Sequence, residues 1–259
     1  MAAAILVGFF AGRTTFTGSQ EHGRDSLAVG LADAARLPVS PLPAFRPGRP
    51  RLLSRRETVS RWAAVVHRAA ARRAPSPSAP IVATVDTRTP EDTTNIVLVI
   101  GDHRTRRTLW ARVRLPTLPN NTTGWVHRSD LGGYHFVHTY LVVDLKRLTA
   151  TLTVDGRVVF LAPVGVGQSQ WPTPTGEFYV RDKLTRYASP FYGPIAFGTS
   201  ARSEVLTDWP EGGFVGIHGT SEPQLVPGRV SHGCIRLRNS DIIRLSRLMP
   251  VGTPLTITS

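Results

Sequence analysis

The chain contains a single cysteine, Cys234, which lies in the sequence SHGC at residues 231–234. A thiol with an ordinary pKa of about 8.5 is only a few per cent thiolate at neutral pH, so a catalytic cysteine needs a cationic or hydrogen-bonding neighbour. His218 is the candidate base, because a strand that ends at His218 and a loop that returns to Cys234 would bring imidazole and thiol together. The next residue, Gly219, has no side chain, so we expect a backbone carbonyl to orient the imidazole. This arrangement predicts nucleophilic catalysis by the thiol.

Gly233 precedes the thiol, and a glycine there lets the backbone approach a substrate carbonyl closely. We expect the N–H groups of Gly233 and Cys234 to form an oxyanion hole. Two other interpretations of these residues compete with catalysis. A lone cysteine in an apolar strand is often a small core residue, and a zinc site made of His218, His232 and Cys234 would lack a fourth ligand. A single cysteine also excludes an internal disulfide and a cysteine-cluster metal site.

Other motifs accompany this pair along the last 125 residues. The stretch that runs from His218 through SHGCIRLRN resembles the signature of the YkuD-type L,D-transpeptidases. TPTGEF at 173–178 matches the Thr-Pro-Thr-Gly-x-Phe turn of that family, YGP at 192–194 matches a second segment, and VGTP at 251–254 matches the entry to the last strand. The resemblance covers residues 138–257.

The resemblance implies a cysteine acyltransferase that acts on peptidoglycan stem peptides, without a metal or cofactor. It assigns roles to seven residues: Cys234 as the nucleophile, His218 as the general base, Gly219, Gly233 and His232 as orienting or oxyanion-hole residues, and Ser231 and Arg236 as substrate-binding residues. For Arg236, a role as a salt-bridge partner stays open. The acyl group would pass to an amine of a second stem after release of D-Ala. An L,D-carboxypeptidase that transfers to water and a non-catalytic wall-binding protein are the alternatives.

The elements that must position these residues are mostly strands. Residues 135–259 show strand patterns at 138–145, 150–154, 157–166, 176–181, 214–218 and 253–258, with a hairpin turn at Asp155-Gly156. One helix is expected, capped by Asn239 or Ser240 and ended by Pro250. The fold class is therefore mainly β, and the resemblance implies a YkuD-like catalytic sandwich over residues 135–259.

Residues 81–134 also alternate short apolar runs with turn residues. Strand patterns lie at 96–100 and 109–115, and a Gly-Trp-Val strand follows the turn NNTTG. The stretch RLPTLPNNTTGWVHRSDL is similar to the closing hairpin of bacterial Src-homology-like barrels. We therefore expect a small β-barrel here.

The first 80 residues differ in composition from the rest. Residues 1–53 begin with an apolar run that resembles an export signal without its basic start, and continue as a Pro- and Arg-rich arm without a fold. Residues 54–80 are expected to form an amphipathic helix from Ser54 to Arg73 and then a linker. The catalytic domain or a membrane surface would cover the apolar stripe of this helix.

The formal net charge of +13 is concentrated in this region, since residues 1–80 carry 12 arginines and 4 acidic residues. The region lacks interleaved aromatic residues and a recognition motif, so we expect no nucleic-acid partner. An anionic membrane or cell-wall polymer suits the arm instead. The longest apolar run, Ala2 to Ala11, has ten residues if Gly8 is counted, which excludes a multi-span membrane protein. We expect an exported protein on the cell-wall side, with its N-terminus as a membrane attachment.

Overall fold

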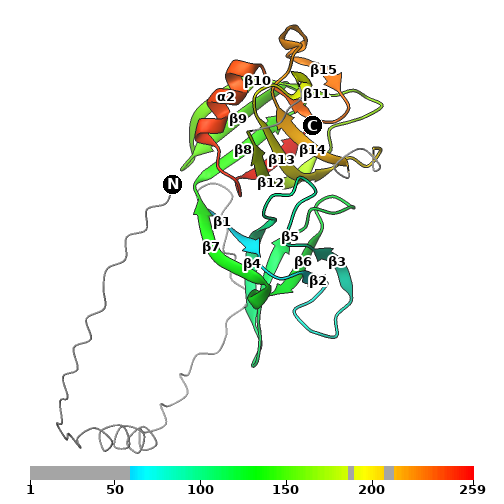
Figure 1. Ribbon diagram of the computed structural model, residues 1–259, viewed down its shortest axis with the longest axis vertical. Coiled ribbons are helices and arrows are strands. Elements are labelled where there is room, and N and C mark those ends of the chain that lie inside the picture. Colours follow the sequence, from blue (N-terminus) through cyan, green and yellow to red (C-terminus); the bar gives the residue numbers. More distant parts are fainter. Residues whose placement is uncertain (1–58, 186–189, 207–212) are drawn as a thin grey trace, which may run out of the picture. The chain divides into compact units, whose positions relative to one another are not determined.

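The computed structural model describes residues 59–185, 190–206 and 213–259, which belong to one compact unit and form two β-sheets (Figure 1). The expected arm over 1–53 and the first residues of the expected helix lie outside the described residues. Within the described ranges, no helix is long and apolar enough to cross a membrane. The mainly β fold class is confirmed.

The N-terminal sheet has seven strands in the order β3-β2-β6-β5-β4-β1-β7, with β3 and β7 at its edges. Its strands are β1 Ser60–Val65, β2 Ala69–Arg72, β3 Ile81–Val85, β4 Ile96–Arg104, β5 Leu109–Arg114, β6 Thr123–His127 and β7 Leu131–Val137, with the 3-10 helix η1 Arg128–Asp130 before β7. Alternate residues of these strands form a core that includes Val99, Val113 and Val126. The Src-homology-like barrel stays a prediction, because this strand order describes an open sheet with two edges.

The amphipathic helix expected from Ser54 to Arg73 is wrong over the described residues, which form β1 and β2 instead. Strand β1 lies between β4 and β7 and pairs with both, so its backbone groups are satisfied by neighbours far away in the sequence. Burial also follows the strand period: Ala63 and Val65 are buried, whereas Val66 of the expected apolar stripe is 46% exposed. Tertiary pairing thus overrides the local helical pattern, and the N-terminal sheet begins at Ser60 rather than at residue 81.

The C-terminal sheet has ten strands in the order β10-β9-β8-β17-β12-β13-β14-β16-β11-β15. Its strands are β8 Thr139–Asp144, β9 Thr149–Val154, β10 Arg157–Pro163, β11 Gly165–Gly167, β12 Gly176–Leu184, β13 Ala196–Arg202, β14 Phe214–His218, β15 Gly228–Ser231, β16 Ile235–Arg236 and β17 Pro254–Thr258. The short helices are η2 Pro190–Tyr192 and η4 Pro223–Leu225. All six strand segments expected between residues 138 and 258 are present.

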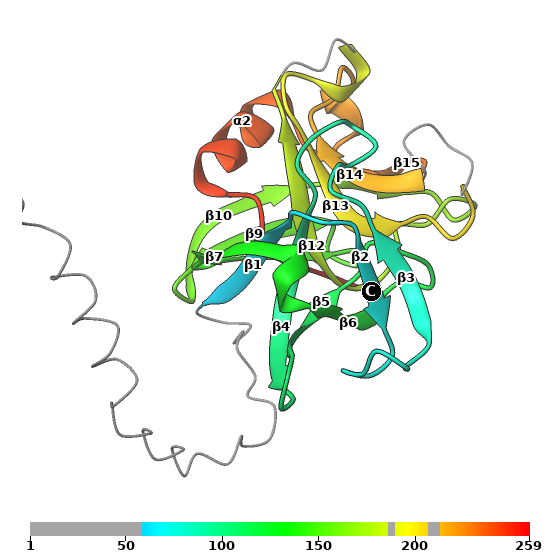
Figure 2. The same ribbon diagram turned by 60° about the horizontal axis from the view of Figure 1, so that its bottom comes forward.

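The α-helix α2 Asn239–Leu248 lies beside β9 and β10 in both views (Figure 1 and Figure 2). Its buried residues Ile242 and Leu245 join the large core of the C-terminal sheet. The expected helix is confirmed, but neither expected cap is: Arg238 is the N-cap, and no side chain caps the helix. The side-chain oxygen of Asn239 accepts a hydrogen bond from the Thr220 N–H at 2.9 Å instead, which ties the helix to the loop after β14.

The two sheets share a small buried cluster made of Ile96, Leu98 and Tyr179. Tyr179 on β12 is fully buried, and its hydroxyl donates to the carbonyl of Ile96 on β4 at 3.0 Å. Burial raises its pKa well above the ordinary value for tyrosine. The phenol therefore stays protonated as a donor between the sheets.

Candidate active site

The thiol and the candidate base are brought together by two parallel strands. β14 pairs with β16 so that His218 lies opposite Arg236, and this register places Gly216 beside Cys234. Because alternate residues of a strand point to one side, these four residues share one face. The Gly216 N–H donates to the Cys234 sulfur at 3.4 Å.

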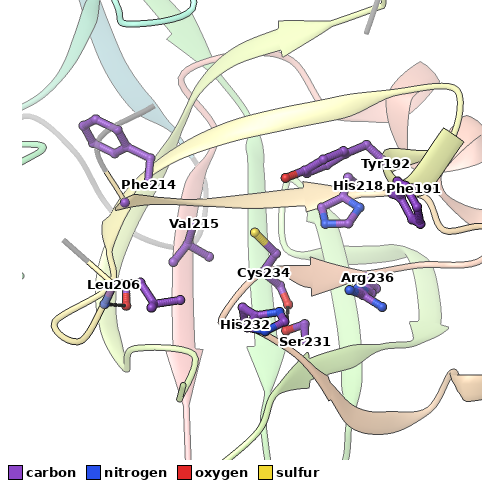
Figure 3. Close-up of a pocket in the computed structure, with 12 residues that line it drawn as sticks. Phe191, Tyr192, Leu206, Phe214, Val215, His218, Ser231, His232, Cys234 and Arg236 are labelled. Atoms are coloured by element: carbon purple, nitrogen blue, oxygen red, sulfur yellow. Dashed lines mark hydrogen bonds between the residues drawn. The ribbon is translucent and has the colours of Figure 1, made fainter. Parts of the chain in front are cut away.

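This face opens into a pocket of about 290 Å³ (Figure 3). Five of the seven residues that received a role from the sequence line this pocket: His218, Ser231, His232, Cys234 and Arg236. Figure 3 shows His218, at the end of β14, and Cys234, directly before β16, close together in this pocket. The expected juxtaposition of imidazole and thiol is therefore present.

His218 is 4% exposed, and its Nδ1 lies 2.6 Å from the carbonyl oxygen of Gly219. A carbonyl can only accept, so Nδ1 carries the proton and Nε2 carries the lone pair of the neutral ring. Burial lowers the pKa of His218 to about 4; the hydrogen bond to Gly219 opposes this shift, and the positive charge of Arg236 adds to it. The imidazole is thus neutral at pH 7 and able to accept a proton. The Tyr192 ring packs on it at a centroid distance of 4.5 Å.

The position after the base, Gly219, has little room for a side chain. A Cβ on Gly219 would overlap the Asn239 Oδ1 and approach the Gly193 backbone. The carbonyl that orients His218 is therefore held by close backbone packing, and Gly193 has a φ of +65°, which favours glycine there too.

The cysteine loop is fixed by hydrogen bonds within it. The Ser231 hydroxyl donates to the Cys234 carbonyl at 2.6 Å and accepts from the Gly233 N–H at 3.1 Å. This second bond occupies the N–H that we assigned to an oxyanion hole, so Gly233 does not offer that donor in this structure. Its φ of +114° requires glycine for the turn itself. The oxyanion role of the Cys234 N–H stays a prediction, and Ser231 acts on the loop rather than as a pocket donor.

The remaining assigned residues have partners of their own. His232 is exposed and packs against the Trp171 ring at a centroid distance of 4.1 Å. Arg236 forms an ion pair with Glu222 at 3.3 Å while it lines the pocket, so both expected interpretations of this arginine are compatible with its position.

Thr173 is a residue of the site that no role was assigned to from the sequence. Its hydroxyl donates to the Gly233 carbonyl and accepts from the Gly167 N–H, both at 2.8 Å. It thereby ties the TPTG turn to the cysteine loop. The TPTGEF match marked this segment, but nothing local in the sequence shows which loop it contacts.

No group of three or more His, Cys, Asp or Glu side chains in the described parts of the chain could hold a metal ion.

Comparison with known proteins places this site in a family. The YkuD family, described as the L,D-transpeptidase catalytic domain, matches residues 138–257. YqjB of Bacillus subtilis, a protein assigned to the L,D-transpeptidases, is 31% identical over 127 residues, which cover 46% of this chain and 70% of YqjB. The chain belongs to the YkuD family of L,D-transpeptidases. The resemblance stated from the sequence motifs is thus confirmed for the catalytic domain.

Other similar proteins each match just under half of this YkuD-family chain. YkuD of Bacillus subtilis is 35% identical over 118 residues, and the match covers 46% of this chain and 65% of YkuD. The chain thus spans just under two thirds of the length of that relative. A solved structure of the catalytic domain of an Enterococcus faecium L,D-transpeptidase is 26% identical, with a TM-score of 0.36, and covers 46% of this chain and 95% of the domain.

Proposed function

We propose that this chain is a cysteine-dependent L,D-transpeptidase that acylates Cys234 with a peptidoglycan stem peptide. The observation that carries the proposal is the shared pocket of Cys234 and a neutral His218 whose Nδ1 proton is held by the Gly219 carbonyl. This arrangement leaves Nε2 as the proton acceptor that a thiol needs in order to attack. Membership of the YkuD family supports the stem peptide as the donor.

In the first step, the Cys234 sulfur attacks the carbonyl carbon before the terminal D-Ala while His218 takes the thiol proton. The C–S bond forms and the C–N bond breaks, and the imidazolium returns its proton to the leaving nitrogen of D-Ala. A thioester on Cys234 and free D-Ala result.

In the second step, an amine attacks the thioester carbonyl and His218 accepts the proton that the amine loses. The C–N bond forms, the C–S bond breaks, and the thiolate regains its proton from the imidazolium. An amine of a second stem as acceptor gives a cross-link, whereas water as acceptor gives the hydrolysed tripeptide and an L,D-carboxypeptidase reaction. The two outcomes share every step up to the thioester.

The substrate lies outside the cytoplasm, so we propose that the chain is exported and works on the cell-wall side. The excess of arginine over acidic residues in residues 1–80 supports an anionic membrane or wall polymer as the partner of the arm.

Release of D-Ala from a stem tetrapeptide tests the proposal directly. The wild-type protein is expected to release D-Ala and, with a second stem present, to form a cross-linked dimer. Cys234→Ser should reduce release by several orders of magnitude with an unchanged melting temperature, because a hydroxyl has a far higher pKa than a thiol. Release by Cys234→Ser at the wild-type rate would contradict the proposal, and a product made only of tripeptide would identify water as the acceptor.

A further inference from the structure

A buried ion pair joins the two sheets close to the catalytic pocket. The Arg181 side chain on β12 is 1% exposed, and its Nη2 lies 2.7 and 2.9 Å from the two carboxylate oxygens of Glu91. Glu91 belongs to the connection between β3 and β4 of the N-terminal sheet, and its side chain is 10% exposed. A buried charge pair of this kind loses its compensation when one partner is removed. Glu91 therefore determines the environment of Arg181.

Arg181 in turn contacts a wall of the pocket. Its Cζ lies 3.8 Å from the centroid of the Phe214 ring. Phe214 begins β14, the strand that ends at His218, and its side chain lines the pocket together with Cys234. Arg181 thus contacts both Glu91 and Phe214, a residue of the pocket lining.

A second arginine beside Phe214 is also held from the N-terminal sheet. The Cζ of Arg202 lies 5.0 Å from the Phe214 ring. The backbone N–H and carbonyl of Arg202 form hydrogen bonds of 3.0 and 2.8 Å with the side chain of Asn120, which lies between β5 and β6. The Arg181 guanidinium and the Arg202 backbone near this ring are therefore both bound by residues from the loops of the N-terminal sheet.

Glu91 also reaches the site itself. It lines a second, smaller hollow together with Phe214, His218 and Cys234. The other carboxylate near Arg181 is that of Asp182, at 3.5 Å, with its Oδ1 accepting from the Gly198 N–H. Glu91 is thus the closer of the two counter-charges.

We propose that Glu91 is a positioning residue for the catalytic pocket: by binding Arg181 it fixes Phe214 as the aromatic wall against which the donor stem peptide binds. This inference rests on the proposed function, since it concerns the same substrate. It assigns to the N-terminal sheet a part in the recognition of the donor. The reacting atoms are untouched, so the effect belongs to substrate binding rather than to the chemistry of the thiol.

The test compares Glu91→Gln with Asp92→Asn in the full chain. Asp92 lies in the same loop, its side chain is 82% exposed, and its φ of +57° suits asparagine. With the stem tetrapeptide as donor, Glu91→Gln is expected to raise KM about tenfold while kcat changes less than about threefold, and Asp92→Asn to match the wild type. Glu91→Asp, which keeps the charge on a shorter side chain, should give an intermediate KM.

A double-mutant cycle with Phe214→Leu separates positioning from a general loss of stability. If Glu91 acts through Phe214, the double variant Glu91→Gln/Phe214→Leu should have the KM of Phe214→Leu alone. Additive effects on KM, or a Glu91→Gln variant that differs from the wild type only in melting temperature, would overturn the inference. A wild-type protein that releases no D-Ala would reject the proposed function and this inference with it, whereas a wild-type KM in Glu91→Gln would reject the inference alone.

Discussion

At the scale of single residues, the proton on His218 decides how the thiol is activated. Burial lowers the pKa of this imidazole to about 4, so at neutral pH the ring is uncharged before substrate binds. A neutral ring accepts the thiol proton during attack, whereas a charged ring would stabilise a thiolate in advance. The structure therefore favours general-base activation over a standing imidazolium–thiolate pair.

The rate of acylation should fall on the acidic side only near pH 4, rather than near the ordinary histidine pKa of about 6.5. Above the pKa of His218 the ring is neutral and active, and below it the ring is protonated and cannot accept the thiol proton. Single-turnover acylation by a stem tetrapeptide, measured from pH 3.5 to 8, checks this limit. Arg236→Gln removes a nearby positive charge, so it should move the limit to higher pH. A wild-type limit near pH 6.5 would contradict the account.

The lowered pKa of His218 also makes the folded protein less stable in acid. Between about pH 6.5 and pH 4 the unfolded chain binds a proton on His218 that the folded chain does not bind, so stability falls as the pH falls through this window. The full difference is about 3 kcal/mol, reached below pH 4. Urea unfolding at several pH values should show this loss in the wild type, and His218→Gln should lack that part of it. Equal acid sensitivity in both proteins would count against a buried neutral His218.

Cys234 and His218 were predictable because each lies in a short local motif and the register of two strands brings the motifs together. The Gly219 carbonyl was predictable for a related reason, since no side chain is available beside His218. The ion pair of Glu91 with Arg181 was not predictable, because the two residues are 90 positions apart and no sequence motif contains both. The Gly233 N–H does not serve the expected oxyanion hole in this structure, because it donates to the Ser231 hydroxyl. The sequence does not show this bond, since the orientation of that hydroxyl depends on the folded loop.

At the scale of elements, strands with alternating apolar residues were recognised and strands of small residues were not. β1 and β2 are rich in alanine, which favours helices, so their local pattern indicates a helix while their neighbours β4, β6 and β7 impose pairing. β13 has the sequence AFGTSAR, which gives no apolar alternation, and it is held by β12 and β14 on either side. Whether such a segment becomes a strand depends on the neighbouring strands that pair with it, and a local sequence window does not contain these strands.

Gly219 follows the end of β14 and packs against Asn239 and Ile242 of α2, so a substitution there should disturb both elements. The Cβ of Gly219→Ala would overlap Asn239 and press on Gly193, and relief of that overlap should cost about 1–3 kcal/mol. The movement should also displace the carbonyl that binds His218 Nδ1 and slow acylation. Gly133→Ala in β7 is the control, since nothing lies within 4 Å of its added Cβ. Thermal melts of both variants check this, and equal melts would show that the loop after β14 relaxes freely.

At the scale of the whole molecule, the two sheets behave as one folded unit rather than as an enzyme with a tethered binding module. β12 contributes Tyr179 and Arg181 to the contact, and both are buried against residues of the N-terminal sheet. Asn121 adds a further bond, because its side-chain oxygen accepts from the Glu177 N–H at 2.6 Å. A chain cut between the sheets would leave a buried charge and a phenol without their partners.

Residues 138–259 expressed alone should therefore be less stable than residues 59–259. Loss of the partners of Arg181 and Tyr179 should lower the melting temperature by about 10 °C or more, or abolish a cooperative transition. The measurement is a thermal melt of both chains together with their acylation by a small donor. Equal melts and equal acylation would show that the N-terminal sheet is dispensable for the fold of the site.

The central claim is that Cys234 is an acylatable nucleophile activated by His218, and intact-mass spectrometry with a carbapenem tests it most directly. Attack on the β-lactam carbonyl breaks the ring C–N bond but keeps both parts attached, so the protein should gain the whole mass of the compound once. The account predicts this single adduct on the peptide that contains Cys234, much slower formation in His218→Ala, and none in Cys234→Ser. No adduct on the wild type, or an adduct of equal yield on Cys234→Ser, would contradict it.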